Sequence, residues 1–159
     1  MPRRRQSLEP AKPRHWESLR LEDRIGSGIV VLFVGINPGV RSATIGHHFA
    51  GFSNRFWKLL FEARLVPELL RAEDDRRLVE FHYGITNLVP RPTPGIDTLR
   101  PAEYVDGLES LKEKVRRWKP PVVAFVRWRG MAPMLELQPR TRTKPAPAGM
   151  RTQSLQRGG

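Results

Sequence analysis

Three short apolar runs rich in β-branched residues lie along the chain. They cover Ile29–Val34, Gly84–Val89 and Val122–Val126. None of them alternates apolar and polar positions, as a strand with one solvated face would. Each run therefore predicts a strand that is covered on both faces, which is typical of a parallel sheet.

Between these runs, apolar positions recur at helical spacing. The predicted helices cover Asn54–Arg64, with Ser53 as its cap, then Ala72–Phe81, and Pro101–Trp118. The buried stripe expected on the last helix consists of Val105, Leu108, Leu111, Val115 and Trp118. The order β-α-α-β-α-β predicts an α/β fold, a three-layer α/β/α sandwich with a mostly parallel central sheet.

The two ends of the chain lack the regular apolar spacing that core elements show. Residues 1–24 are polar and basic, and residues 127–159 are rich in Arg and Pro with the single acid Glu136. We expect a basic disordered arm at 1–24, one α/β domain at 25–126 and a disordered tail at 127–159.

Charge narrows the classes of partner. The 159 residues include 28 Lys and Arg against 16 Asp and Glu, a net charge of +12. Such an excess favours a polyanion, because basic side chains that neutralise phosphates release condensed counterions. A solvated basic surface without a partner explains the same charge. No apolar run approaches the roughly 20 residues of a membrane span, so we expect no membrane partner and a cytoplasmic location.

Several cofactor classes are excluded by missing residues. The chain has no cysteine, and it has neither a Gly-x-Gly-x-x-Gly motif nor a Gly-Lys-Ser/Thr loop. Its four histidines, His15, His47, His48 and His82, do not have the spacing of a metal site. We therefore expect neither a metal nor a cofactor.

Asn37 is the strongest candidate for chemistry. It lies in Gly35-Ile36-Asn37-Pro38-Gly39, directly after the first predicted strand, and ligands of open α/β sheets bind at the carboxyl ends of strands. An Asn amide cannot act as a general base, but it can position a water molecule. The leaving group of such a reaction must then depart without the help of a strong base, and a nucleobase that leaves as a delocalised anion meets this need. On spacing alone, a simple turn-forming role for Asn37 stays open.

Three segments in order carry a family resemblance. They are Gly35–Gly39, Gly46–Lys58 and Gly84–Thr93, and together they resemble the mismatch-specific uracil/thymine-DNA glycosylases. The resemblance extends from about Val30 to Val126. It implies a monomeric repair enzyme, associated with the nucleoid, that excises uracil or thymine from G·U or G·T pairs in double-stranded DNA by base flipping.

The resemblance also implies roles for individual residues. Asn37 would be the catalytic residue that holds the attacking water, and Phe49 would stack on the extruded base. The other substrate-binding positions would be Gly35, Ile36, Pro38, Gly39, Ser42 and Asn54. Contacts to DNA would come from Arg55, Lys58 and Arg91, whereas we expect Phe56 and Trp57 to be core.

The end of the chain departs from the family pattern. The family's last motif, a Pro-Ser segment after a fourth core strand, supplies the wedge that fills the gap left by the flipped base. We do not find it here, since Val126 is followed by Arg127-Trp128-Arg129-Gly130. We hypothesise that residues 127–159 come from a shifted reading frame or a truncated gene copy, which would leave a sheet edge exposed.

This departure keeps two alternatives to a glycosylase open. One is a family member that binds nucleic acid without catalysis. The other is an α/β protein whose charge has no role in DNA binding, although the segment Gly46–Lys58 argues against it.

Overall fold

Three parallel strands form the centre of the structure. The computed structural model describes residues 14–126. Its sheet has the order β2-β1-β3, with β1 at Val31–Gly35, β2 at Tyr83–Asn87 and β3 at Val122–Phe125. Both neighbours run parallel to β1, and Val31 lies opposite Tyr83 on one side and Val122 on the other. All three predicted strands are confirmed.

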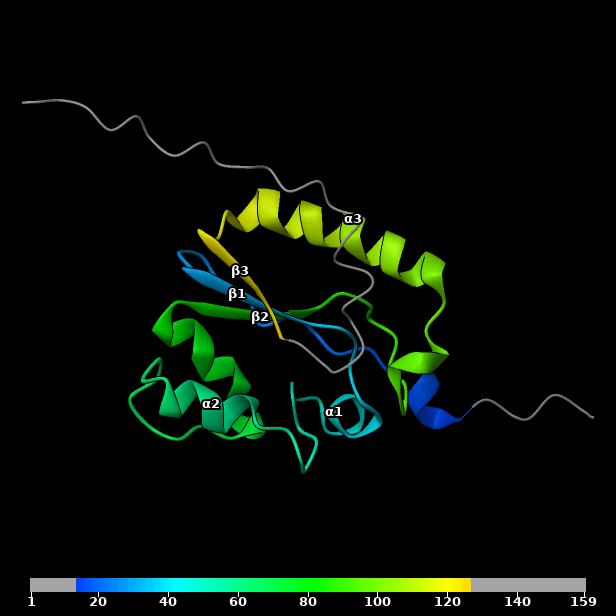
Figure 1. Cartoon of the computed structure of the whole chain (residues 1–159), viewed down its shortest axis with the longest axis horizontal. Helices are drawn as coiled ribbons and strands as arrows, with labels where there is room; N and C mark the ends of the chain where they lie inside the picture. Colours follow the sequence, from blue (N-terminus) through cyan, green and yellow to red (C-terminus); the bar gives the residue numbers. More distant parts are fainter. Residues whose placement is uncertain (1–13, 127–159) are drawn as a thin grey trace, which may run out of the picture. The chain divides into compact units, whose positions relative to one another are not determined.

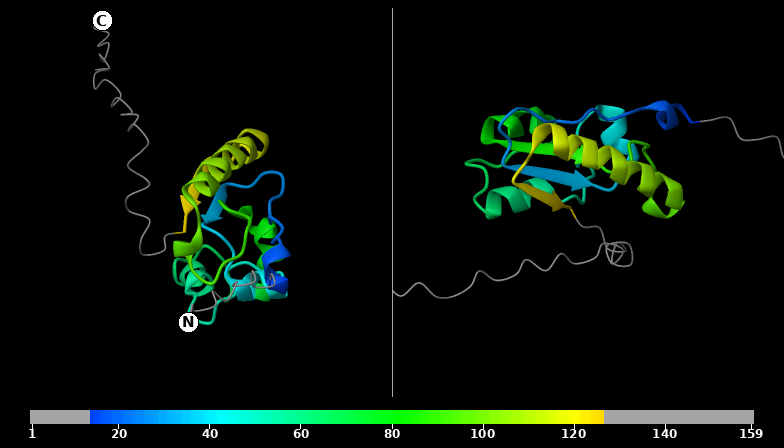
Figure 2. Two further views of the ribbon diagram at one scale, coloured as in Figure 1. Left: turned by 90° about the vertical axis from the view of Figure 1, so that its right-hand side faces the viewer. Right: turned by 90° about the horizontal axis from the view of Figure 1, so that it is seen from above.

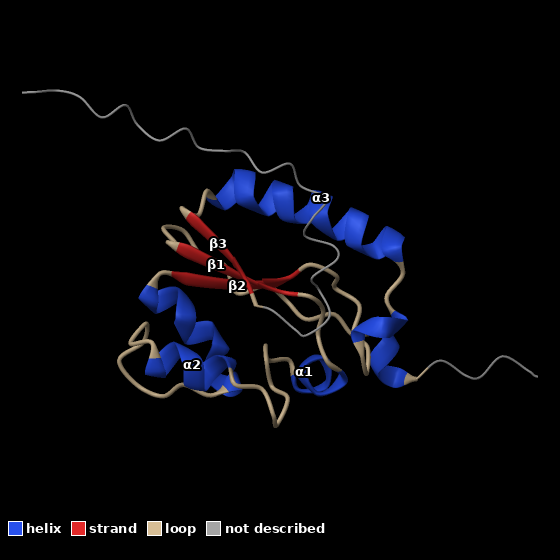
Figure 3. Ribbon diagram, in the orientation of Figure 1, coloured by secondary structure: helices blue, strands red, loops and turns tan. Residues whose placement is uncertain are grey.

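Helices cover both faces of this sheet (Figure 1). The long helix α3, Pro101–Trp118, lies across one face (Figure 2). The opposite face carries α1, α2 and the 3-10 segment η2, at Val40–Ile45, Phe56–Glu62 and Ala72–Phe81. Two single 3-10 turns, η1 at His15–Ser18 and η3 at Ile96–Thr98, complete the elements drawn in Figure 3. The predicted three-layer α/β/α sandwich is confirmed.

Each face of the sheet has its own apolar cluster, because successive side chains of a strand point to opposite faces. Phe33 of β1 packs with the buried side chains on the α2 side: Phe56, Trp57, Leu60, Leu78 and Ile85. Leu32 and Val34, the residues next to Phe33 in β1, pack with the buried side chains on the α3 side of the sheet: Ile29, Leu88 and Leu111. The prediction that Phe56 and Trp57 are core residues is confirmed, since each is 6% exposed.

The helical elements differ from the sequence expectation in three ways. The helix expected at Asn54–Arg64 begins at Phe56, and its first N–H donates to the side-chain oxygen of Asn54 rather than to Ser53. The segment Ala72–Phe81 has 3-10 rather than α geometry. Helix α1 was not predicted, because a run of six residues is too short to show a helical period.

Two expectations of burial are wrong. Val105, placed in the buried stripe of α3, is 60% exposed, whereas Leu111 of the same stripe is buried. Strand β3 was expected to be buried, yet Val122 is 50% and Phe125 37% exposed. Among the described residues β3 pairs with β1 alone, whereas Ile85 of the other outer strand, β2, also forms a bridge with Arg24; β3 is therefore the more exposed edge strand. The expectations for residues 1–13 and 127–159 lie outside the described residues.

A buried ion pair connects the amino-terminal part of the described chain to the layer that contains α1 and α2. Asp75 is fully buried and accepts hydrogen bonds from Arg24 Nε at 3.2 Å and from the backbone N–H of His48 at 3.0 Å. Arg24, 8% exposed, also donates through Nη2 to the carbonyl of Gly46 at 2.9 Å. The segment Gly46–Ala50 is therefore held from two directions.

We predict that Asp75→Ala lowers the free energy of unfolding by about 3–5 kcal/mol, because it removes the buried carboxylate that pairs with Arg24 and leaves the backbone N–H of His48 without its acceptor. Urea denaturation measures the change. Glu73→Ala, an exposed position of the same 3-10 segment, is the control and should stay within about 0.5 kcal/mol of wild type. Equal effects of the two substitutions would contradict the anchoring role of Asp75.

Candidate active site

Two loops run side by side beyond the carboxyl ends of β1 and β2. The first loop is Ile36–Gly39 and the second is Leu88–Gly95. The β1–β2 pairing continues into them: the N–H of Leu88 donates to Gly35 and that of Val89 to Ile36, both at 2.8 Å. Further on, a parallel bridge joins Gly39 to Thr93. Side chains from two distant parts of the sequence are thereby held together.

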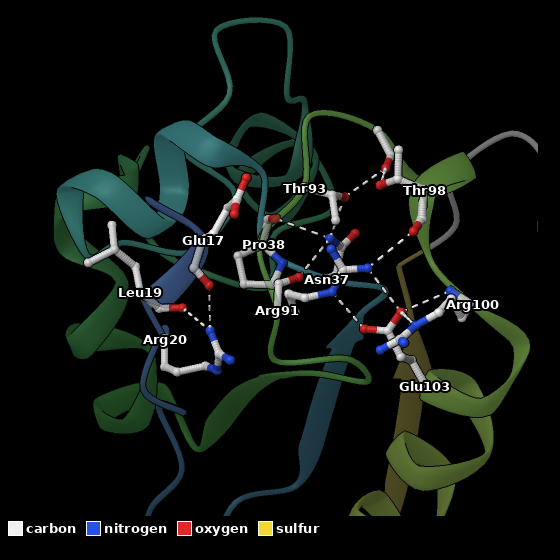
Figure 4. A network of polar contacts seen from close by, with 11 residues as sticks. Glu17, Leu19, Arg20, Asn37, Pro38, Arg91, Thr93, Thr98, Arg100 and Glu103 are labelled. Carbon is white, nitrogen blue, oxygen red and sulfur yellow. Dashed lines mark hydrogen bonds and ion pairs between the residues drawn. The ribbon is translucent and has the colours of Figure 1, made fainter. Parts of the chain in front are cut away.

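The amide of Asn37 is clamped between these loops (Figure 4). Its Nδ2 donates to the carbonyl of Arg91 at 3.0 Å and to Thr93 Oγ1 at 2.7 Å. The hydroxyl of Thr93 donates its own hydrogen to the carbonyl of Gly95 at 2.7 Å. Thr93 Oγ1 must therefore accept from Asn37, and the carbonyl of Arg91 can only accept. Both partners require the amide nitrogen to face them.

This arrangement fixes the direction of the other amide atom. The two hydrogens of Asn37 Nδ2 go mainly to Arg91 and Thr93, with a longer contact to the carbonyl of Pro38 at 3.3 Å, so Oδ1 points away from all three acceptors. Within residues 14–126, no group donates a hydrogen bond to Oδ1, and the residue is half-buried at the sheet edge. Asn37 therefore presents an oriented acceptor, which is what a residue that positions water needs.

Asn87 lies beside the first loop and was not singled out from the sequence. It is the last residue of β2 and pairs with Gly35, the last residue of β1. A Cβ on Gly35 would lie 2.6 Å from Asn87 Oδ1 and 3.3 Å from the ring of Phe49. The missing side chain of Gly35 thus lets an amide and an aromatic ring converge on one point.

A buried histidine orients Asn87. His48 is 1% exposed, and its Nε2 lies 2.9 Å from the carbonyl of Glu22, which can only accept. Nε2 therefore carries the proton and Nδ1 accepts from Asn87 Nδ2 at 3.4 Å. Burial lowers the pKa of His48 below its ordinary 6.5, which keeps the ring neutral and preserves this tautomer.

Phe49 has a strained backbone and a stacked ring. Its φ is +53°, in the left-handed region that a bulky side chain rarely adopts. The ring stacks on Phe56 with centroids 4.1 Å apart and planes inclined by 32°. Strain of this kind persists where surrounding contacts impose it, and it is concentrated at functional sites. Here the contacts of Asp75 with His48 supply that constraint.

The other predicted pocket residues have identifiable contacts. Ser42 is buried, and its Oγ accepts from the backbone N–H of Ala50 at 3.0 Å, which ties α1 to the Phe49 segment. Ile36 and Pro38 are buried, while Gly39 is exposed. Asn54 is exposed and caps α2. The structure therefore gathers the predicted pocket positions around Asn37 and Phe49, with Asn54 at the start of the next helix. Their roles in binding stay predictions.

The predicted DNA-contacting cations differ in their surroundings. The guanidinium of Arg91 is bound by Glu103, with Nε to Oε1 at 2.7 Å and Nη2 to Oε2 at 2.9 Å, and these bonds lower the pKa of Glu103 to about 2. Lys58 forms an exposed ion pair with Glu62 at 3.5 Å. Arg55 is exposed. A phosphate contact by any of the three stays a prediction.

Fold and site together define a class of protein: a parallel α/β/α sandwich with an oriented amide at the carboxyl edge of its sheet. A family model described as the uracil DNA glycosylase superfamily matches residues 25–144, and the chain belongs to this superfamily. Its members are DNA glycosylases, which are hydrolases that act on DNA. The match continues past Val126, where the resemblance seen in the sequence ends. No helix within residues 14–126 has the length and apolar character needed to cross a membrane.

We predict that stability falls as the pH drops below 6.5 because of His48. The unfolded chain binds a proton at His48 near pH 6.5, whereas the folded state keeps the ring neutral to lower pH. Between these two pKa values the unfolded state holds more protons, so the unfolding free energy decreases by up to about 1.4 kcal/mol per pH unit. Unfolding measured from pH 7.5 to 5 should show this slope.

His48→Gln should remove most of that slope, whereas His15→Gln, at an exposed histidine, should retain it. A slope that is unchanged in His48→Gln would show that another group is responsible.

Proposed function

We propose that this chain excises uracil, or thymine, from G·U or G·T pairs in double-stranded DNA by base flipping and water attack. One observation carries the proposal: the amide nitrogen of Asn37 is clamped by Arg91 and Thr93, so its oxygen is a fixed acceptor at the sheet edge. The superfamily match supports a DNA glycosylase, and the mismatch preference rests on the three segments that resemble the mismatch-specific group.

In the proposed mechanism, Asn37 Oδ1 accepts a hydrogen bond from a water molecule. The oxygen lone pair of that water is then directed at C1′ of the flipped deoxyribose. As the N-glycosidic bond breaks, its electron pair goes to N1 of the base, and the water adds as hydroxyl at C1′. The released proton passes to the base anion or to solvent. No covalent enzyme intermediate, metal or cofactor takes part.

Two side chains would hold the base, one through an aromatic ring and one through an amide. Phe49 is braced from behind by Phe56, so its ring offers a preformed stacking surface. Asn87 is held through one N–H by His48, and its remaining N–H and its Oδ1 have no hydrogen-bond partner among the described residues. One donor beside one acceptor matches the N3–H and O4 edge of uracil or thymine. Cytosine presents the opposite pattern, and the contact with His48 opposes rotation of the amide.

The preference for mismatches would come from the cost of flipping. Extruding a base costs a few kcal/mol and is easiest where pairing is already weak. The basic excess of the chain, +12 overall, would supply contacts to phosphates. In this proposal the protein acts as a monomer, in the cytoplasm and close to the nucleoid.

The test is single-turnover excision from a duplex with one G·U pair. Asn37→Ala should lower the rate by on the order of 10²–10³-fold, because it removes an oriented group at the reacting centre. Thr44→Ala, an exposed position of α1, is the matched control and should keep the wild-type rate.

The outcomes separate the candidate functions. If folded wild-type protein binds the duplex but releases no base, the proposal is wrong. The remaining interpretation is then a family member that binds nucleic acid without catalysis. Excision that is equal in wild type and Asn37→Ala would show that the water is held elsewhere.

A further inference from the structure

The most exposed large apolar side chain of the described residues is Phe52, at 91%. It lies in the connection between α1 and α2, which projects from the body of the domain in Figure 1. Single exposed apolar residues are common on protein surfaces, so this exposure alone carries no function. What distinguishes Phe52 is how firmly the surrounding chain holds it in that position.

Phe52 occupies the tip of a clamped turn. The turn Gly51–Asn54 is closed by a hydrogen bond from the N–H of Asn54 to the carbonyl of Gly51 at 2.9 Å. On its amino-terminal side, Ala50 donates to Ser42 Oγ at 3.0 Å and accepts from Arg41 Nε at 2.8 Å. On its carboxyl-terminal side, Asn54 caps α2. An aromatic ring is thus presented to solvent on a well-supported base.

A positively charged side chain lies against the ring of Phe52. The guanidinium of Arg41 lies 4.0 Å from the centroid of Phe52, a cation–π contact, while its Nε holds Ala50. Arg41 forms no ion pair with a carboxylate within residues 14–126. The surface therefore offers an apolar ring and a positive charge together, the combination that enters the stack of bases and contacts the phosphates beside it.

Phe52 and its partner Arg41 are also close in the chain to two residues of the candidate site. Arg41 follows Asn37 by four residues, through the first loop into α1, and Phe52 follows Phe49 by three. The link from Ala50 to Ser42 fixes the distance between these two segments. A ring presented here lies next to the place where Phe49 would receive an extruded base.

We propose that Phe52 is the wedge that enters the duplex and takes the place of the flipped base, with Arg41 on the neighbouring phosphate. This inference rests on the proposed function, and it assigns to the α1–α2 turn the task that the resembled family gives to its last motif, which we do not find in this sequence. Aromatic and aliphatic side chains inserted between base steps partly unstack them and open the helix. Phe52 would thereby stabilise the flipped state that Phe49 and Asn87 receive.

The experiment measures unstacking without cleavage. The full-length protein is added at saturating concentration to a G·U duplex in which the uridine carries a 2′-fluorine, which resists glycosidic cleavage. The fluorescent base 2-aminopurine stands next to it, and anisotropy of a terminal dye confirms binding. Wild type should raise the 2-aminopurine fluorescence several-fold, because an inserted ring unstacks the neighbouring base.

Three variants sharpen the result. Phe52→Ala should bind the duplex without the fluorescence rise, and Phe52→Leu, which keeps an apolar wedge, should restore most of it. Leu69→Ala removes another exposed apolar side chain, 58% exposed, in the connection between α2 and η2, and should behave as wild type. Thermal melting checks that all variants fold.

A full fluorescence rise in Phe52→Ala, or no rise in bound wild type, would overturn the wedge. Either result leaves the excision test with Asn37→Ala untouched, so the two proposals fail independently.

Discussion

The side-by-side pairing of the loops after β1 and β2 is the constraint on which the candidate site depends. Parallel strands end at the same edge of a sheet, and here their backbone hydrogen bonds continue for two more residues, from Leu88 to Gly35 and from Val89 to Ile36. This continuation brings Thr93 and the carbonyl of Arg91 to the amide of Asn37. An isolated Gly-Ile-Asn-Pro-Gly turn would leave that amide free to rotate, and the oriented oxygen would be lost.

A second group of polar contacts supports the aromatic side of the site. Arg24 and Asp75 are buried together, and they hold the backbone of Gly46 and His48, which directly precede the strained Phe49. Neutral His48 in turn orients Asn87. Burying these charges costs free energy of folding, but it fixes the position of the segment that brings the ring of Phe49 next to the amide of Asn87. Stability and site geometry are therefore coupled through the same residues.

The sequence predicts the scaffold better than the site. Apolar runs locate all three strands, and the Pro101–Trp118 periodicity locates α3 with its observed bounds. Helix α1 is too short to show a period, and the exposure of β3 depends on how many strands flank it. Asn37 follows from its position after a strand. Asn87 does not, because its importance depends on the β1–β2 register, and the partner of Arg91, Glu103, belongs to a helix that no local pattern connects to it.

The most direct test of this account is the single-turnover excision rate of Thr93→Val on a G·U duplex. The substitution removes the hydroxyl that accepts from Asn37 Nδ2, so the amide loses one of its two clamps at a cost of about 1 kcal/mol. Thr98→Val is the matched control, since the Thr98 hydroxyl also donates to Gly95 but does not contact Asn37. The account predicts a rate roughly fivefold lower for Thr93→Val alone, with unchanged affinity for the duplex. A wild-type rate in Thr93→Val, or an equal loss in both variants, would contradict it.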